Sequence, residues 1–106
     1  MTALHLARRV RELLSEPGRW TQGYFARDAA GQECASKDPA ATCWCVVGAM
    51  VRLGSDDPRP DIEFINALKA HLGPPCSLSM WNDAPGRTHA DVLALLDRVV
   101  AQMERE

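Results

Sequence analysis

The sequence lacks the features that mark membrane proteins and nucleic-acid-binding proteins. It has no run of about 20 apolar residues, the length needed to cross a bilayer, and no excess of positive charge, with 12 basic side chains against 14 acidic ones. Proteins that bind nucleic acid through its phosphates usually carry a basic surface. Here only Arg8, Arg9 and Arg11 cluster, on what should be the solvated side of a helix. We therefore expect no membrane segment and no nucleic-acid partner.

The sequence also lacks a Cys-x-x-Cys pair, and its first residues do not resemble a signal peptide. The first residues show no apolar stretch followed by a small-residue cleavage site, so we expect a cytoplasmic protein with reduced thiols. Zinc sites usually take two ligands from one Cys-x-x-Cys turn. Cys43 and Cys45 are only two residues apart, and on a helix they would point about 200° away from each other. We therefore expect no metal and no other cofactor. A zinc-stabilised binding domain is the third hypothesis, and it would draw on Cys34, Cys43, Cys45, Cys76, His5, His71 and His89.

What the sequence does contain is typical of one folded domain spanning residues 1–106. Hydrophobic residues make up 46% of the chain and charged residues 25%, a balance found in globular rather than disordered proteins. Apolar residues spaced three and four apart predict amphipathic helices over 3–14 and 61–72, and a long last helix from Thr88. Thr88 and Asp91 have the spacing of a capping box, with Asp in place of the usual Glu or Gln.

The segment 42–53 stands out because it contains a single charge, Arg52. We predict a helix here that is buried on nearly all sides. Gly48 and Ala49 are small enough for another backbone to approach closely, so Gly48→Leu should destabilise the fold by overpacking. Gly54 would end the helix.

The segments on either side of this helix are less regular. Residues 24–27 and 32–35 could pair as a short hairpin around a turn, or form an irregular loop held by Trp20 and Phe25. A short apolar run at 78–81 leads into a cluster of turn-forming residues at 82–87. The predicted fold is a mainly α, compact four-helix domain around the central helix, with the short hairpin between its first and second helices.

One hypothesis for function rests on a nucleophilic cysteine. A thiolate is stabilised near a helix N-terminus, and Cys45 lies near the start of the predicted central helix. A cysteine-dependent acyl-transfer enzyme also needs a base and a group that orients it. His89 with Asn82 or Asp83 is the only such set that the sequence places together. The alternative is that His89 extends an apolar helix stripe while Asn82 and Asp83 bond to nearby backbone.

Aromatic residues are few, and three of them are candidates for binding. Trp81, next to Asn82 and Asp83, could be a recognition residue, as could Trp20 and Tyr24. The alternative for Trp81 is that it packs on the central helix.

Three short motifs resemble a family whose function is unknown, DUF6197, which occurs in bacteria and phages. They are Trp-Thr-Gln-Gly at 20–23, Cys-Val-Val-Gly-Ala-Met at 45–50 and Trp-Asn-Asp at 81–83, the last followed by the helix from Thr88. The resemblance implies that the central helix and the Trp-Asn-Asp turn belong together. It implies no activity, cofactor or catalytic residue.

The leading hypothesis is a small regulatory module that binds another protein, such as an inhibitor carried by a phage or another mobile element. Small size, mild charge and the lack of a convincing catalytic motif favour it over the enzyme and zinc hypotheses. The sequence does not indicate an oligomeric state.

Overall fold

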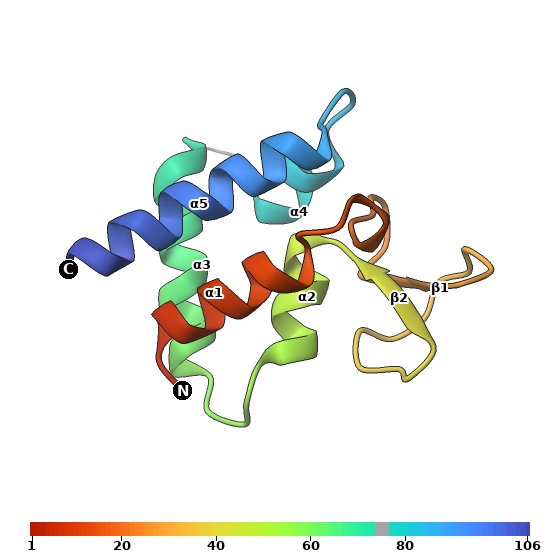
Figure 1. Cartoon of the computed structure of the whole chain (residues 1–106), viewed down its shortest axis with the longest axis horizontal. Coiled ribbons are helices and arrows are strands. Elements are labelled where there is room, and N and C mark those ends of the chain that lie inside the picture. The colour runs from red at the N-terminus through yellow and green to blue at the C-terminus, as the bar shows by residue number, and fades with distance from the viewer. Residues whose placement is uncertain (74–76) are drawn as a thin grey trace.

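The molecule consists of helices with a small sheet at one end (Figure 1). The structure is a computed structural model, which describes residues 1–73 and 77–106. The elements in this part of the chain, in order, are α1 (Ala3–Leu13), the 3-10 turn η1 (Pro17–Arg19), β1 (Ala26–Asp28), β2 (Ala41–Trp44), α2 (Val46–Leu53), α3 (Arg59–Leu72), α4 (Leu78–Asp83) and α5 (His89–Arg105). The expectation of a mainly α fold with a short hairpin is confirmed.

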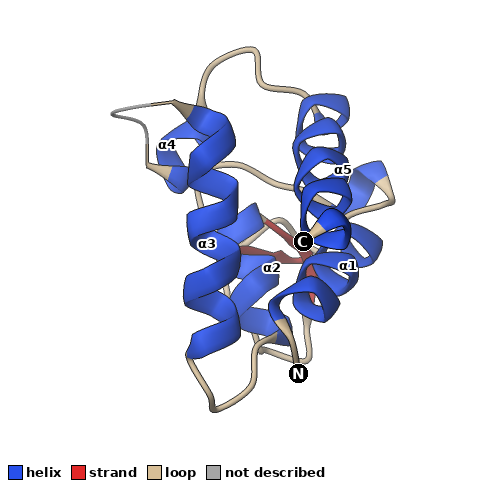
Figure 2. Ribbon diagram, turned by 90° about the vertical axis from the view of Figure 1, so that its left-hand side faces the viewer, coloured by secondary structure: helices blue, strands red, loops and turns tan. Residues whose placement is uncertain are grey.

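The core lies between the long helices. α1 contacts α2, α3 and α5, and Figure 2 shows α3 on one side of the molecule with α1 and α5 on the other. Apolar side chains point inward from each of these helices, and those with no exposed surface include Leu6, Val10, Phe64, Leu68, Leu95, Leu96 and Val99. In α3 the apolar spacing predicted Ile62 on the buried face, which is wrong, because Ile62 is 55% exposed and Phe64 is buried instead. None of the helices in residues 1–73 and 77–106 is both long and apolar enough to cross a membrane.

The last helix begins with the capping box that its sequence predicts. The Thr88 hydroxyl accepts a hydrogen bond from the Asp91 amide at 3.1 Å, and the Asp91 carboxylate accepts one from the Thr88 amide at 3.0 Å. Hydrogen bonding to the Thr88 amide, and after it to the Thr88 side chain, lowers the pKa of the Asp91 carboxyl below its ordinary value. An aspartate therefore fills the role that a longer acid usually has in this motif.

The hairpin pairs differently from the prediction. β1 and β2 form an antiparallel pair in which Ala26 lies opposite Trp44. The segment 32–35, which we expected to be the partner of β1, contributes a single bridge between Arg27 and Glu33. The predicted turn does form, because the Asp28 carboxylate accepts hydrogen bonds from two backbone amides, those of residues 30 and 32.

The prediction of a central helix over residues 42–53 is wrong for its first turn. Residues 41–44 form β2, and the helix starts only at Val46. A short apolar run fits a strand as well as a buried helix, and here the β1 backbone supplies hydrogen-bonding partners that an isolated first turn lacks. Cys43 therefore lies on a strand and is partly exposed, so the expectation that it is a core residue on a helix is also wrong.

The expected turn at Asn82 and Asp83 is instead the end of the short helix α4. Its N-terminus is capped by the Ser77 hydroxyl, which accepts a hydrogen bond from the Met80 amide at 3.1 Å. This cap follows the sequence rule for serine before a helix. Cys76 lies outside the described residues.

Candidate functional site

Asn82 is the centre of a hydrogen-bond network that joins three separate parts of the chain. Its side chain has no exposed surface. Its Oδ1 accepts hydrogen bonds from the Trp20 indole N–H at 2.8 Å and from the Val46 amide at 3.1 Å. Its Nδ2 donates to the Thr21 carbonyl at 3.1 Å and to Asp83 Oδ1 at 2.9 Å. Both lone pairs and both N–H groups of this amide are thus in use, as burial requires.

The segment 20–23 is also tied to the end of α4 by its other residues. The Gln22 side-chain amide donates to the carbonyls of Asn82 at 2.9 Å and Ala84 at 3.2 Å. The Gly23 amide donates to Asp83 Oδ1 at 3.0 Å. The three motifs noted in the sequence, at 20–23, 45–50 and 81–83, therefore meet at one place in the fold.

Cys45 is the residue that caps α2. Its Sγ accepts a hydrogen bond from the Gly48 amide at 3.2 Å, while Asn82 Oδ1 takes the Val46 amide beside it. The cysteine is 4% exposed. Burial raises the pKa of the Cys45 thiol above its ordinary value, the charge of Asp83 adds to the rise, and hydrogen bonds from nearby amides oppose it. The thiol is therefore held in its protonated form at neutral pH.

Gly48 allows the backbone of the segment before β1 to pack directly on α2. A Cβ atom at this position would lie 1.9 Å from the Phe25 carbonyl oxygen. The same oxygen accepts a hydrogen bond from the Cys45 amide at 3.2 Å. The predicted close approach of a backbone to this small residue is confirmed.

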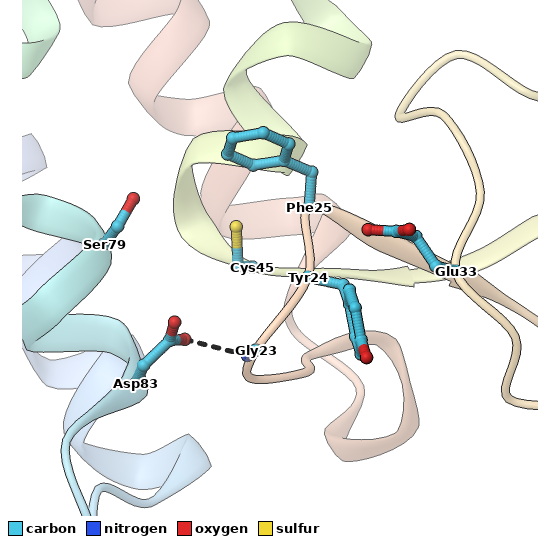
Figure 3. A pocket seen from close by; sticks show the side chains of 7 residues that line it. All are labelled: Gly23, Tyr24, Phe25, Glu33, Cys45, Ser79 and Asp83. Carbon is cyan, nitrogen blue, oxygen red and sulfur yellow. Dashed lines mark hydrogen bonds between the residues drawn. The ribbon is translucent and has the colours of Figure 1, made fainter.

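The segment 20–23, the start of α2 and the end of α4 meet at a junction, and a pocket of about 210 Å³ opens beside it. Figure 3 shows it between the segment 23–25, the start of α2 and one side of α4. It is lined by Gly23, Tyr24, Phe25, Glu33, Cys45, Ser79 and Asp83. Two carboxylates, two hydroxyls, one thiol and two aromatic rings thus share one small concave surface.

The proposed catalytic set is only partly brought together. Cys45 and Asp83 line the pocket, and the Asn82 side chain, which does not line it, donates a hydrogen bond to Asp83. His89 is not among the lining residues, and its Nε2 lies 2.6 Å from the Leu14 carbonyl oxygen. A catalytic base must come within hydrogen-bonding reach of its nucleophile. The structure therefore gives Cys45 an acidic neighbour and gives His89 a different partner.

The three aromatic binding candidates have different surroundings. Trp20 is partly buried, and its indole N–H donates a hydrogen bond to the buried Asn82 side chain. Trp81 packs against the core, and the Arg87 guanidinium lies 4.1 Å from the centre of its ring. Tyr24 is 43% exposed and lines the pocket, with the Arg27 guanidinium 4.4 Å from its ring centre. Of the three, only Tyr24 is exposed rather than partly buried.

Three pocket residues had no functional role in the sequence predictions. Phe25 was expected to hold a loop in place, yet its side chain is 57% exposed. Glu33 and Ser79 come from segments far apart in the sequence and belong to no motif. Only the tertiary arrangement reveals them, so no signal in the sequence could have identified them.

Comparisons with other proteins identify a family but no function. Neither the curated proteins nor the solved structures contain a match to this chain. Within residues 1–73 and 77–106, no three side chains of the metal-ligating types come together. The model of one family, described as a family of unknown function (DUF6197), matches residues 1–102. The chain therefore belongs to the DUF6197 family, as its three motifs suggested.

Proposed function

We propose that the protein is a small cytoplasmic regulatory module that binds another protein through the pocket and its aromatic rim. The observation that carries this proposal is the exposure of Tyr24 and Phe25, 43% and 57%, at the edge of the same pocket. Large aromatic side chains are usually buried, and where they stay exposed beside a concave surface they often form the energetic centre of an interface. A regulator of this size suits a phage or another mobile element that inhibits a host protein.

The rim is held rigidly, which favours binding. The Gly23 amide is bonded to Asp83, and the Phe25 carbonyl is bonded to the Cys45 amide and packed on Gly48. The backbone that carries both aromatic rings is therefore fixed to α4 on one side and to α2 on the other. A surface that is ordered before it binds loses less conformational entropy in the complex.

The experiment is affinity capture from the source cell with the wild-type protein and two variants. Tyr24→Ala combined with Phe25→Ala removes the rim, while Ile62→Ala removes another exposed apolar side chain, 55% exposed on α3. We expect a partner that is retained by the wild type and by Ile62→Ala and lost with the rim variant. Circular dichroism would establish that the rim variant is folded. Equal retention by all three proteins would contradict the proposal.

A thiol-dependent acyl transferase is the second candidate, because Cys45 lines the pocket next to Asp83. It predicts that p-nitrophenyl acetate releases p-nitrophenol in a burst that Cys45→Ser abolishes and Cys34→Ser does not. Identical release by the wild type and by Cys45→Ser would reject it. The raised pKa of the Cys45 thiol favours the binding module over this enzyme.

A further inference from the structure

Two carboxylates at the pocket have no cationic partner within the described part of the chain. The ion pairs among residues 1–73 and 77–106 join Arg8 to Glu104, Arg11 to Asp97 and Arg59 to Asp57. Asp83 uses Oδ1 to accept hydrogen bonds from Gly23 and Asn82, and no described residue bonds to its Oδ2. No described residue bonds to the Glu33 carboxylate. The pocket therefore carries negative charge that the fold itself does not neutralise.

The two acids lie on different sides of the aromatic residues. Figure 3 shows Asp83 at the end of α4, Glu33 on the opposite side, and the segment carrying Tyr24 and Phe25 between them. Asp83 is fixed by its bond to the Gly23 amide at 3.0 Å. A group entering between these side chains would meet carboxylate oxygens and aromatic rings.

The cation that lies over Tyr24, Arg27, makes its hydrogen bonds to groups other than the two carboxylates. The Arg27 guanidinium lies over Tyr24, and it donates to Thr21 Oγ1 at 3.0 Å, the Gly31 carbonyl at 3.0 Å and the Gln22 carbonyl at 3.2 Å. None of these acceptors is a carboxylate. Arg27 thus shows that a guanidinium can occupy the Tyr24 ring face, and it leaves Glu33 and Asp83 open to a second cation.

We infer that the pocket accepts a lysine or arginine side chain of the partner protein. This inference rests on the proposed function and names the chemistry of the partner at that site. A cation is attracted both by the carboxylates and by aromatic ring faces. An acidic side chain would be repelled, and an apolar one would remove water from the carboxylates without replacing their hydrogen bonds. The volume of about 210 Å³ suits a single side chain rather than a folded element.

The test uses short blocked peptides and the isotope-labelled protein. Acetyl-Gly-Lys-Gly-amide and acetyl-Gly-Arg-Gly-amide are titrated while the backbone amide resonances of the protein are followed by NMR. Acetyl-Gly-Leu-Gly-amide and acetyl-Gly-Glu-Gly-amide serve as the apolar and acidic controls. We expect the basic peptides to shift the resonances of Gly23, Tyr24, Phe25 and Glu33, and the controls to leave them unchanged.

Variants then assign the effect to the pocket charge. Glu33→Gln keeps the size of the side chain. It should lower the affinity for the basic peptides roughly fivefold, as expected for the loss of one exposed ion pair. Glu63→Gln, at an exposed position on α3, removes the same charge elsewhere and should leave binding unchanged. Equal weakening by both variants would mean that only net charge matters and would overturn the inference. Shifts of the same size with the leucine peptide would overturn it as well.

The outcome separates this inference from the proposed function. If a partner is captured through Tyr24 and Phe25 but basic peptides do not bind the pocket, the proposed interaction module is supported and the inference of a basic side chain in the pocket is wrong. If basic peptides bind at Glu33 but no captured partner depends on the rim, the pocket's preference for a basic side chain is supported and the proposed interaction module is contradicted.

Discussion

At the scale of single residues, the hydrogen bonds of the Asn82 side chain hold separate segments of the chain together. Among the described residues, only Ser36 and Asn82 are buried polar side chains, and Asn82 has no exposed surface at all. A buried amide is costly unless its hydrogen bonds are made, and here they join the segment 20–21 and the start of α2 to the end of α4. Sequence reasoning paired Asn82 with His89 as a catalytic group. Because the amide has no hydrogen-bonding position left, a structural role accounts for it better.

Asn82→Ala should therefore be strongly destabilising. It leaves the Trp20 indole N–H, the Val46 amide and the Thr21 carbonyl without their partner. At about 1–3 kcal/mol for each buried unpaired group, the loss in the free energy of unfolding should reach roughly 3 kcal/mol or more. Urea denaturation followed by circular dichroism measures it. Asn66→Ala, at an exposed position on α3, is the matched control and should change stability by less than about 0.7 kcal/mol.

The reactivity of Cys45 provides a second prediction at this scale. The thiolate is the reactive form, and burial raises the pKa of this thiol above its ordinary value, so less thiolate is present at neutral pH. Alkylation of Cys45 by iodoacetamide should be slower in the folded protein than in urea, and its rate should rise at a higher pH than in the unfolded chain. Peptide mass spectrometry with Cys45→Ser as the blank measures this. Faster alkylation in the folded state at neutral pH would instead support the thiol-dependent enzyme.

At the scale of elements, the start of α2 positions the pocket. β2 ends at Trp44, Cys45 is extended, and the helix begins at Val46, so strand and helix meet without a loop. Two amides of the first turn have partners outside the helix: the Gly48 amide donates to the Cys45 thiol, and the Val46 amide donates to Asn82 of α4. This arrangement places Cys45 at the pocket and fixes Gly48 against the Phe25 backbone.

Gly48→Ala tests that close approach more sharply than the larger Gly48→Leu. The added Cβ would lie 1.9 Å from the Phe25 carbonyl oxygen and 2.7 Å from its carbon, both of which are backbone atoms. Alanine favours a helix by about 1 kcal/mol over glycine, yet displacing the packed backbone at Phe25 should outweigh this and give a net loss of roughly 1–3 kcal/mol. Thermal or urea melts measure the change. Gly18→Ala is the control, because no atom lies within 4 Å of the Cβ it would add.

If Gly48→Ala proved as stable as the wild type, the contact with Phe25 would have to be looser than the geometry indicates. A gain in stability from Gly18→Ala alone would not affect the conclusion. The comparison between the two substitutions carries the test, since both exchange the same atoms.

The elements also show what sequence patterns can and cannot predict. The long helices, the Thr88 cap and the small face at Gly48 all follow from local spacing and side-chain size, and the structure confirms them. The strand at 41–44 and the short helix α4 were missed because a run of a few apolar residues has no periodicity of its own. The pairing of 26–28 with 41–44, across a long connection, depends on contacts that local patterns do not contain.

At the scale of the whole molecule, the helices and the sheet depend on one another. A two-stranded sheet is marginal by itself in water. Here β2 continues directly into α2, the segment 20–23 is bonded to the end of α4, and α2 contacts α1 in the helical core. The pocket is a product of this junction, because its residues come from the first, middle and last thirds of the chain. A site of this kind cannot be assembled from any one segment.

The molecule should therefore unfold in a single cooperative step. Far-UV circular dichroism reports the helices, while tryptophan fluorescence reports Trp20, Trp44 and Trp81, all of which lie around the sheet or α4. Because the sheet has little stability without the helices, the two signals should give the same urea midpoint. Trp20→Phe removes the indole N–H that bonds to Asn82, and it should lower both midpoints together. A fluorescence midpoint at clearly lower urea than the circular dichroism midpoint would show that the sheet opens alone. The rim of the pocket would then be mobile in the free protein and would not be ordered before it binds.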